Sequence, residues 1–346
     1  MKRRLLRRAG RCLLLALSVA GALPAAAGAV PRAPEFRLAP HEVAPEPTYV
    51  RRVAPALVAL HVRADPGAPS SARLGRRRFG TAVIVDPRGY AVTAGYVVMD
   101  AVHVDARLAS GQRVRAHLVG QDLDSGLALV KFDAPGPWPT ARLGDSRDVG
   151  PGTPTATVSL DEDDERVSVL GQVRAVRRFS GSWEYMLDRA LLVEPGSASW
   201  AGAAVVTVDG TVIGIGSLRL GAPPHVTLAI PVELFAAVQE ELIAAGRVVS
   251  RPPRPWLGLY TRETPAGVVV DGFAAQGPAR HAGFRLGDRI VGVNGVAVRS
   301  QEEFYAALWR GRAGEVVRVA VERGGATLVI AVASVDRYRL RRTPSP

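Results

Sequence analysis

The chain has one cysteine and almost no lysine. Cys12 is the single thiol, and lysine occurs at positions 2 and 131 alone. One thiol cannot form a disulfide within its own chain, so apolar cores must stabilise the fold. Arginine carries nearly all of the positive charge, and the net charge of +12 is spread along the 346 residues. Nucleic-acid binding needs basic residues gathered on one face, so this spread predicts no nucleic-acid partner.

The sequence also lacks the patterns of common metal and nucleotide sites. The acidic run at residues 161–165 is contiguous, whereas an EF-hand loop spaces its ligands. Gly214 and Gly216 follow a strand-like run, but the later glycine and the helix of a dinucleotide site are missing. We therefore expect neither a metal nor a cofactor.

Residues 1–29 have the organisation of a secretory signal peptide. Basic residues between Lys2 and Arg11 precede an apolar run over residues 12–23, and small residues follow Pro24. The apolar run is interrupted before it reaches the roughly 20 residues that span a bilayer. We expect the segment to be cleaved, leaving an exported, periplasmic-type protein with no stable membrane span.

Proline-rich stretches divide the remaining chain into two units. Residues 30–50 contain several prolines without apolar periodicity, which is typical of an extended linker, and residues 251–255 read RPPRP. We expect one domain over residues 51–250 and a second over residues 256–336. Residues 337–346 form a basic tail.

The first unit is rich in β-strand patterns. Short β-rich runs are separated by Gly, Pro and Asp, as in residues 82–93, which read as strand, turn and strand. Many short strands at this spacing predict a closed barrel or a sandwich. One helix is expected, from Pro231 to about Gly246.

A series of motifs in residues 51–250 resembles, in the same order, the HtrA/DegP family of serine proteases. The matching stretches are residues 80–90 (GTAVIVDPRGY), 92–98 (VTAGYVV), 124–131 (DSGLALVK), 143–146 (LGDS), 208–215 (VDGTVIGI) and 228–231 (LAIP). The ordered set is specific to the family, although each stretch is short. The resemblance implies a mainly β fold, with a trypsin-like (chymotrypsin-type) domain of two β-barrels, and homotrimers assembled through this domain.

The family's catalytic positions carry other residues in this chain. Tyr96 stands at the position of the general-base histidine, and Gly126 stands at that of the orienting aspartate. In the nucleophile loop, residues 194–202, the nucleophile position is Ala198 or Ala201, depending on which end of the loop is aligned. A phenol with a pKa of about 10 stays protonated at neutral pH and cannot activate a hydroxyl. The resemblance therefore implies an inactive relative of the serine endopeptidases.

A displaced set of catalytic residues is the alternative. Ser197 or Ser199 would then be the nucleophile, with a histidine supplied by another strand, namely His61, His103, His117 or His225. The protein would be an active serine endopeptidase with non-standard catalytic residues. The two serines stand in a turn and each histidine stands singly, which is more typical of structural residues.

Residues 256–336 resemble the PDZ domain of the same proteases. Residues 277–290 (GPARHAGFRLGDRI) match in their Gly, Pro and Asp spacing, and Ser300 with Glu303 predicts a capped helix. A PDZ domain binds the C-terminus of a peptide as an added strand, and its loop amides hold the carboxylate. The resemblance assigns peptide binding to Trp256, Leu257, Gly258 and Leu259 in the loop, and to Phe304 and Leu308 in the helix.

Together these features predict an exported HtrA-like pseudoprotease. It would act as a non-catalytic peptide- or protein-binding factor in envelope protein quality control, sensing or scaffolding. Its partners would be C-terminal or unfolded protein segments, captured by the PDZ domain.

Overall fold

A computed structural model describes residues 45–340 of the chain. The predicted signal peptide, residues 1–29, and most of the predicted linker lie outside the described residues. None of the helices in residues 45–340 is both long enough and apolar enough to cross a membrane.

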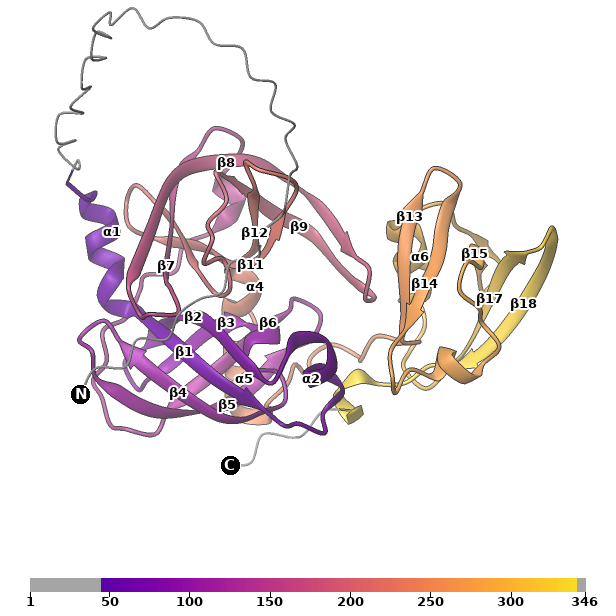
Figure 1. The fold of residues 1–346 in the computed structure, drawn as a ribbon, viewed down its shortest axis with the longest axis horizontal. Coiled ribbons are helices and arrows are strands. Elements are labelled where there is room, and N and C mark those ends of the chain that lie inside the picture. The colour runs from indigo at the N-terminus through magenta and orange to yellow at the C-terminus, as the bar shows by residue number, and fades with distance from the viewer. Residues whose placement is uncertain (1–44, 341–346) are drawn as a thin grey trace, which may run out of the picture. The chain divides into compact units, whose positions relative to one another are not determined.

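The first six strands form a closed β-barrel (Figure 1). Neighbouring strands are antiparallel in the order β1–β2–β3–β6–β5–β4, and β4 pairs with β1 to close the barrel. The strands are β1 (Leu57–Ala64), β2 (Arg77–Asp86), β3 (Tyr90–Ala94), β4 (Ala101–Leu108), β5 (Arg113–Asp122) and β6 (Leu127–Phe132). Apolar side chains fill the interior, where Leu60, Ile84 and Phe132 are fully buried. The β2–β3 hairpin confirms the strand, turn and strand predicted for residues 82–93.

The next six strands form a second closed barrel in the order β10–β11–β12–β9–β8–β7. They are β7 (Pro154–Leu160), β8 (Arg166–Gly181), β9 (Tyr185–Glu194), β10 (Ala204–Thr207), β11 (Val212–Leu220) and β12 (Val226–Pro231). At 16 residues, β8 is long, and its pairing with β9 continues into a two-stranded arm that leaves the barrel (Figure 1). The arm ends in residues 181–184, called the hairpin tip below.

Short helices cover the two barrels. They are α1 (Thr48–Val53), η1 (Ala54–Ala56), α2 (Pro69–Leu74), α3 (Gly95–Val98), η2 (Ser146–Asp148), α4 (Glu233–Ala236) and α5 (Gln239–Ala245). The single helix expected after Pro231 is divided in two, because the backbone at Val238 leaves the helical conformation with φ −128°. Its end is as predicted, since Gly246 terminates α5 in the left-handed conformation.

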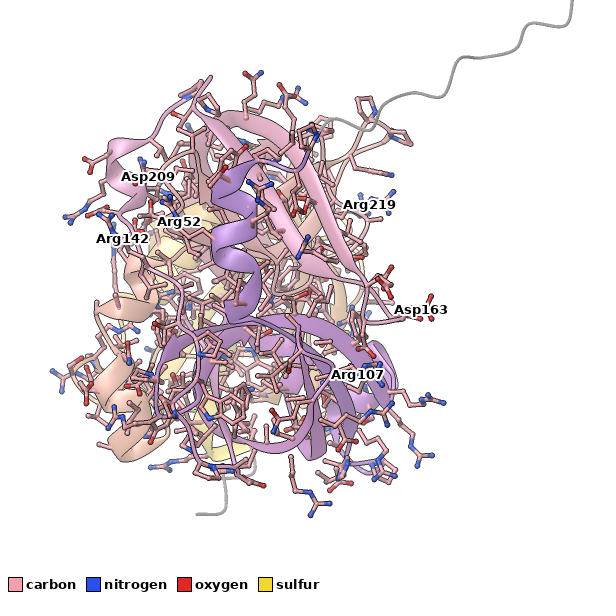
Figure 2. All side chains as sticks on the ribbon, turned by 90° about the vertical axis from the view of Figure 1, so that its left-hand side faces the viewer. Arg52, Arg107, Arg142, Asp163, Asp209 and Arg219 are labelled. Carbon is pink, nitrogen blue, oxygen red and sulfur yellow. The ribbon has the colours of Figure 1, made fainter. Side chains whose placement is uncertain are left out.

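Helix α1 lies against the second barrel (Figure 2). It begins at Thr48, inside the stretch predicted as a linker, and buries Val50 and Val53 in the core. The Arg52 guanidinium donates to the carbonyl oxygen of Asp209 (3.1 Å), and Figure 2 shows these two residues side by side. An apolar pair alone was too little periodicity to predict this helix.

Thr81 of β2 connects the two barrels. Its amide donates to the carbonyl oxygen of Ala201 (2.8 Å), and its hydroxyl accepts from the amide of Leu160 at the end of β7 (2.9 Å). Its own carbonyl accepts from the hydroxyl of Thr93 (2.7 Å). Because Thr81 is completely buried, these bonds supply the partners that its polar groups need.

The acidic run at residues 161–165 makes a second contact between the barrels. Asp164 Oδ1 lies 2.6 Å from His61 Nε2, and Asp164 also pairs with Arg107. Figure 2 shows Arg107 of the first barrel beneath this loop, near Asp163. The loop therefore fastens the second barrel to β1 and β4 of the first.

A third sheet follows the barrels, with the strand order β13–β14–β15–β17–β18 and β16 paired to β15. Its elements are β13 (Leu259–Thr264), β14 (Gly267–Phe273), η3 (Pro278–His281), β15 (Arg289–Val293), β16 (Val296–Ala297), α6 (Gln301–Leu308), β17 (Val316–Arg323), β18 (Ala326–Ala333) and η4 (Arg337–Leu340). Ser300 caps α6 as predicted, since its hydroxyl accepts from the amide of Glu303 (3.1 Å).

This third sheet has its own apolar core. The buried residues of the core all lie between Leu257 and Val332, and they include Phe304 and Tyr305 of α6. Met186, from β9, packs against the edge of this core. A core drawn from one continuous stretch is typical of a domain that folds alone.

Both ends of the third sheet return to the end of β5 and the loop that follows it. Before β13, Arg251 pairs with the buried Asp122 (2.9 Å). After β18, η4 brings Arg337 to 3.5 Å from Asp124. The stretch predicted as a basic tail thus begins with an ordered turn that is bound to the first barrel.

We expect Gly202→Ala to lower the free energy of unfolding by about 2 kcal/mol or more, measured by urea denaturation. Gly202 has φ +75°, and a Cβ there would lie 1.8 Å from the carbonyl oxygen of Thr81, in the junction between the barrels. Gly221→Ala is the matched control, because Gly221 has a similar φ of +77° with no atom within 4 Å of an added Cβ. The control should lose only about 1 kcal/mol. Equal losses at both positions would show that the junction tolerates displacement.

Candidate functional site

A cavity of about 520 Å³ lies where the two barrels meet. Its walls come from β2, α3, the end of β7 and the loop before β10, and they include Gly80, Tyr96, Leu160 and Trp200. Both candidate nucleophile positions, Ala198 and Ala201, also line this cavity. The structure therefore places Tyr96 and the two alanines around one cavity.

Tyr96 points from α3 towards β11. Its hydroxyl donates to the carbonyl oxygen of Ser217 (2.7 Å). Burial raises the pKa of the Tyr96 hydroxyl above its usual value. A phenol that keeps its proton is too weak a base to take a proton from a serine hydroxyl. Ser217 was not singled out from the sequence, because its role depends on a contact between distant segments.

Gly126 has no side chain, and its surroundings leave little room for one. Its φ is +79°, and an added Cβ would lie 3.1 Å from the hydroxyl oxygen of Tyr185. That hydroxyl donates to the carbonyl oxygen of Ser125 (2.6 Å). The nearby Asp122 and Asp124 are paired with arginines, so they serve as structural anions.

The serines of the nucleophile loop are engaged within the second barrel. Ser197 is buried, and its amide donates to the hydroxyl of Thr227 (2.9 Å). The Ser197 hydroxyl accepts from the amide of Ser199 (3.2 Å). The neighbouring His225 directs Nδ1 at the carbonyl oxygen of Gly221 (2.7 Å).

The other candidate histidines pair with carboxylates on the first barrel or beside it. These pairs are His61 with Asp164, His103 with Asp105 and His117 with Asp133. Across residues 45–340, no hydrogen bond joins a histidine to Ser197 or Ser199. In the same range, no cluster of three or more His, Cys, Asp or Glu side chains is arranged to hold a metal ion.

The loop before β13, predicted to bind a peptide carboxylate, binds the side chain of Glu184. The amide of Leu257 donates to Glu184 Oε2 (2.9 Å), and the amide of Leu259 donates to Glu184 Oε1 (2.7 Å). Gly258, between them, has φ +77°, and a Cβ there would lie 2.4 Å from the Cα of Gly277. The loop therefore requires glycine at this position to present both amides to one carboxylate.

The rest of the hairpin tip lies between β13 and α6. The amide of Thr261 on β13 donates to the carbonyl oxygen of Ser182 (2.9 Å). The hydroxyl of Tyr305 on α6 donates to the carbonyl oxygen of Gly181 (2.7 Å) and accepts from the amide of Glu184 (3.3 Å). We call the space between β13 and α6 the peptide groove.

Two of the residues predicted to bind peptide are buried. The sequence analysis expected Phe304 and Leu308 to line the side-chain pocket, and both are completely buried in the core of the third sheet. They lie four residues apart on the face of α6 that packs on the sheet. Tyr305, the neighbour of Phe304, instead faces β13 and the hairpin tip. Trp256 holds the start of the loop by pairing with Val335.

Sequence reasoning missed Glu184 and Tyr305. The segment around Glu184 looks like an ordinary turn between two strands, and its partners lie more than 70 residues further along the chain. Tyr305 carried a weak signal, since a tyrosine beside the apolar face of an amphipathic helix needs a partner for its hydroxyl when it is buried.

Burial raises the pKa of Glu184 to about 7, although the amides of Leu257 and Leu259 and the charge of Arg337 favour the ionised form. In the unfolded chain the pKa of Glu184 would lie near its ordinary value of 4.5. The folded state therefore holds the proton to higher pH than the unfolded state does. The contribution of this pKa difference to the free energy of unfolding is fully present below about pH 4.5. It is lost as the pH rises through 7.

We expect Glu184→Gln to remove this pH dependence. Relative to the variant, the native protein should lose about 1–3 kcal/mol of unfolding free energy between pH 4.5 and 7.5, measured by urea denaturation across that range. Asp188→Asn, an exposed carboxyl on the same hairpin, is the control and should leave the profile unchanged. Parallel profiles for the native protein and Glu184→Gln would contradict the assignment.

Comparison with known proteins identifies both parts of the chain. Residues 80–215 match the trypsin-like peptidase domain family, and residues 255–333 match the PDZ domain family. The serine endoprotease DegS of Salmonella typhimurium (strain 14028s / SGSC 2262) is 28% identical over 312 residues, covering 84% of this chain and 85% of DegS. A probable periplasmic serine endoprotease, DegP-like, of Ectopseudomonas mendocina (strain ymp) is 28% identical over 277 residues, covering 75% of this chain but 57% of that protein. The chain thus spans little more than half the length of the DegP-like relative.

Solved structures agree with this architecture. The serine endoprotease from Yersinia pestis has a TM-score of 0.53 at 26% identity, covering 83% of this chain and 96% of that chain. The HtrA-type protease AlgW with a decapeptide has a TM-score of 0.54 at 22% identity, covering 86% of this chain and 98% of that chain, a likeness of fold. The chain thus combines a trypsin-like domain of two β-barrels with a PDZ domain, in this order, and it is similar in sequence to the DegS and DegP-like serine endoproteases.

Proposed function

We propose that this protein is an exported, HtrA-like pseudoprotease that captures C-terminal or unfolded protein segments through its PDZ domain without cleaving them. Its role would lie in quality control, sensing or scaffolding in the cell envelope. The observation that carries the proposal is the pair of amides on Leu257 and Leu259, which hold a carboxylate at 2.9 and 2.7 Å. A peptide's terminal carboxylate presents the same two oxygens to the same donors.

The cavity between the two barrels, called the cleft below, supports the non-catalytic part of the proposal. Acyl transfer by a serine needs a base within hydrogen-bond reach of the hydroxyl and a third group that orients the base. Tyr96 occupies the cleft as a protonated phenol bound to the Ser217 carbonyl, and Gly126 supplies no carboxylate. Loss of a complete triad costs on the order of a million-fold in turnover.

An active serine endopeptidase with non-standard catalytic residues is the second candidate. It is favoured by the similarity to proteins named as serine endoproteases, DegS and DegP-like proteins among them. Its nucleophile would be Ser197 or Ser199, and a rearrangement would have to bring a base to one of their hydroxyls. Covalent labelling distinguishes the two candidates, because it requires an activated serine.

We expect the purified chain from residue 30 onward to hydrolyse neither casein nor unfolded peptides, and to remain unlabelled by a fluorophosphonate probe, because no base activates its serines. Label incorporation would be read by mass spectrometry, with an active trypsin-like protease as the positive control. The Ser197→Ala and Ser199→Ala variants are the matched controls. Labelling that either substitution abolishes would establish the active endopeptidase instead.

We expect a fragment covering residues 252–346, which contains the whole core of the third sheet, to bind peptides with a free apolar C-terminus. The dissociation constant should be of micromolar order, about −8 kcal/mol, measured by fluorescence anisotropy. Amidating the peptide should weaken binding, because an amide removes the charge that the loop amides hold. Equal affinity for free and amidated peptides, or no binding to either, would reject peptide capture.

A further inference from the structure

The peptide groove is already filled by the protein's own hairpin. Glu184 places its carboxylate on the loop amides, and Ser182 gives its carbonyl to the amide of Thr261 on β13. Gly181 is held from the other side by the hydroxyl of Tyr305. A PDZ domain binds a C-terminal peptide in the same two ways: the peptide backbone pairs with a strand, and the peptide carboxylate binds to the loop amides.

We propose that the hairpin tip, residues 181–184, is an internal ligand of the PDZ groove, and that a peptide C-terminus must displace Glu184 before it can bind. This inference rests on the proposed function, because it takes a C-terminal peptide as the ligand of the groove. It adds that the groove is closed in the free protein and that its ligand competes with a segment of the same chain.

The two ligands cannot share the groove. The amides of Leu257 and Leu259 each donate one hydrogen bond, and both point at the oxygens of Glu184. Glu184 is 1% exposed, so no second carboxylate reaches these amides while it is in place. Competition for the two donors is therefore direct.

The hairpin keeps the tip close to the groove, while the contacts of the tip with the groove can be exchanged. Strand pairing along β8 and β9 keeps residues 181–184 at a high effective concentration beside β13. Apolar contact by residues 181–184 is limited, since Trp183 is 39% exposed and stacks on Tyr185 of its own hairpin. Beyond the tip, Met186 packs against the PDZ core and Arg178 pairs with Glu302. Residues 181–184 themselves are therefore held mainly by hydrogen bonds to the groove, and these are the bonds that a peptide can replace.

The backbone conformation of Glu184 also makes its contact with the loop amides easier to replace. Its φ is +53°, a left-handed conformation that a residue with a side chain adopts at a cost. The loop amides help to hold Glu184 in this conformation. A peptide that takes these amides removes part of what stabilises the turn.

The test compares peptide binding by the native protein and by single-residue variants, all without the signal peptide but with both barrels and the PDZ domain. Glu184→Ala should bind a peptide with a free apolar C-terminus about tenfold or more tightly than the native protein, because the groove no longer has to open first. Asp188→Ala, on the same hairpin but outside the groove, is the matched control and should bind like the native protein. Tyr305→Phe removes the hydroxyl that holds Gly181 and Glu184, so it should also bind more tightly.

Hydrogen exchange gives a second measurement that does not depend on a peptide. The amides of Leu257, Leu259 and Thr261 should be protected in the native protein and in Asp188→Ala, and should exchange faster in Glu184→Ala. Thermal unfolding with an unchanged midpoint for the barrels shows that the variants are folded.

The outcomes separate the two proposals. Tighter peptide binding and faster exchange in Glu184→Ala support the internal ligand. Equal peptide affinity in the native protein and in both groove variants, with binding intact, overturns the internal ligand and leaves peptide capture standing. Failure of every variant to bind any free C-terminus overturns peptide capture itself, and the internal ligand with it.

Discussion

A carboxylate that enters a protein interior loses its hydration, and it must receive hydrogen bonds or an opposite charge in return. This requirement acts at two places where parts of this molecule meet. Glu184 is buried on two amides of the loop before β13, and Asp122 is buried against Arg251. Removing Arg251 would leave the buried Asp122 carboxylate unpaired, which is far more costly than losing a surface ion pair.

The same need for partners is met inside the protein at the cavity and at the groove. In the cavity between the barrels, the Ser217 carbonyl accepts a hydrogen bond from Tyr96. In the groove, the amides of Leu257 and Leu259 are used by Glu184. Binding of the proposed peptide at the groove is thus an exchange of partners.

The fold was predictable from sequence to the extent that its signals are local. The turn after Asp86, the capped helix at Ser300 and the spacing of residues 277–290 are patterns of neighbouring residues, and each identified its element. The division of the helix at Val238 was not predicted, because the apolar pattern continues through it. The role of Glu184 could not be predicted for a different reason. Glu184 is buried by a loop far along the chain, and no pattern in its own turn indicates that contact.

Two attachments of the PDZ domain to the first barrel converge on the end of β5 and the loop that follows it, through Arg251 with Asp122 and Arg337 with Asp124. Arg73 of α2 also stacks on the ring of Tyr260 in β13 at 3.7 Å, so the domain contacts the first barrel at a second place. If the hairpin tip leaves the groove as proposed, these contacts keep the domain beside the barrels. Return of the tip is a unimolecular step whose rate is independent of protein concentration. Release of a bound peptide would accordingly be followed by closure within the same molecule, and the protein would reset without a partner.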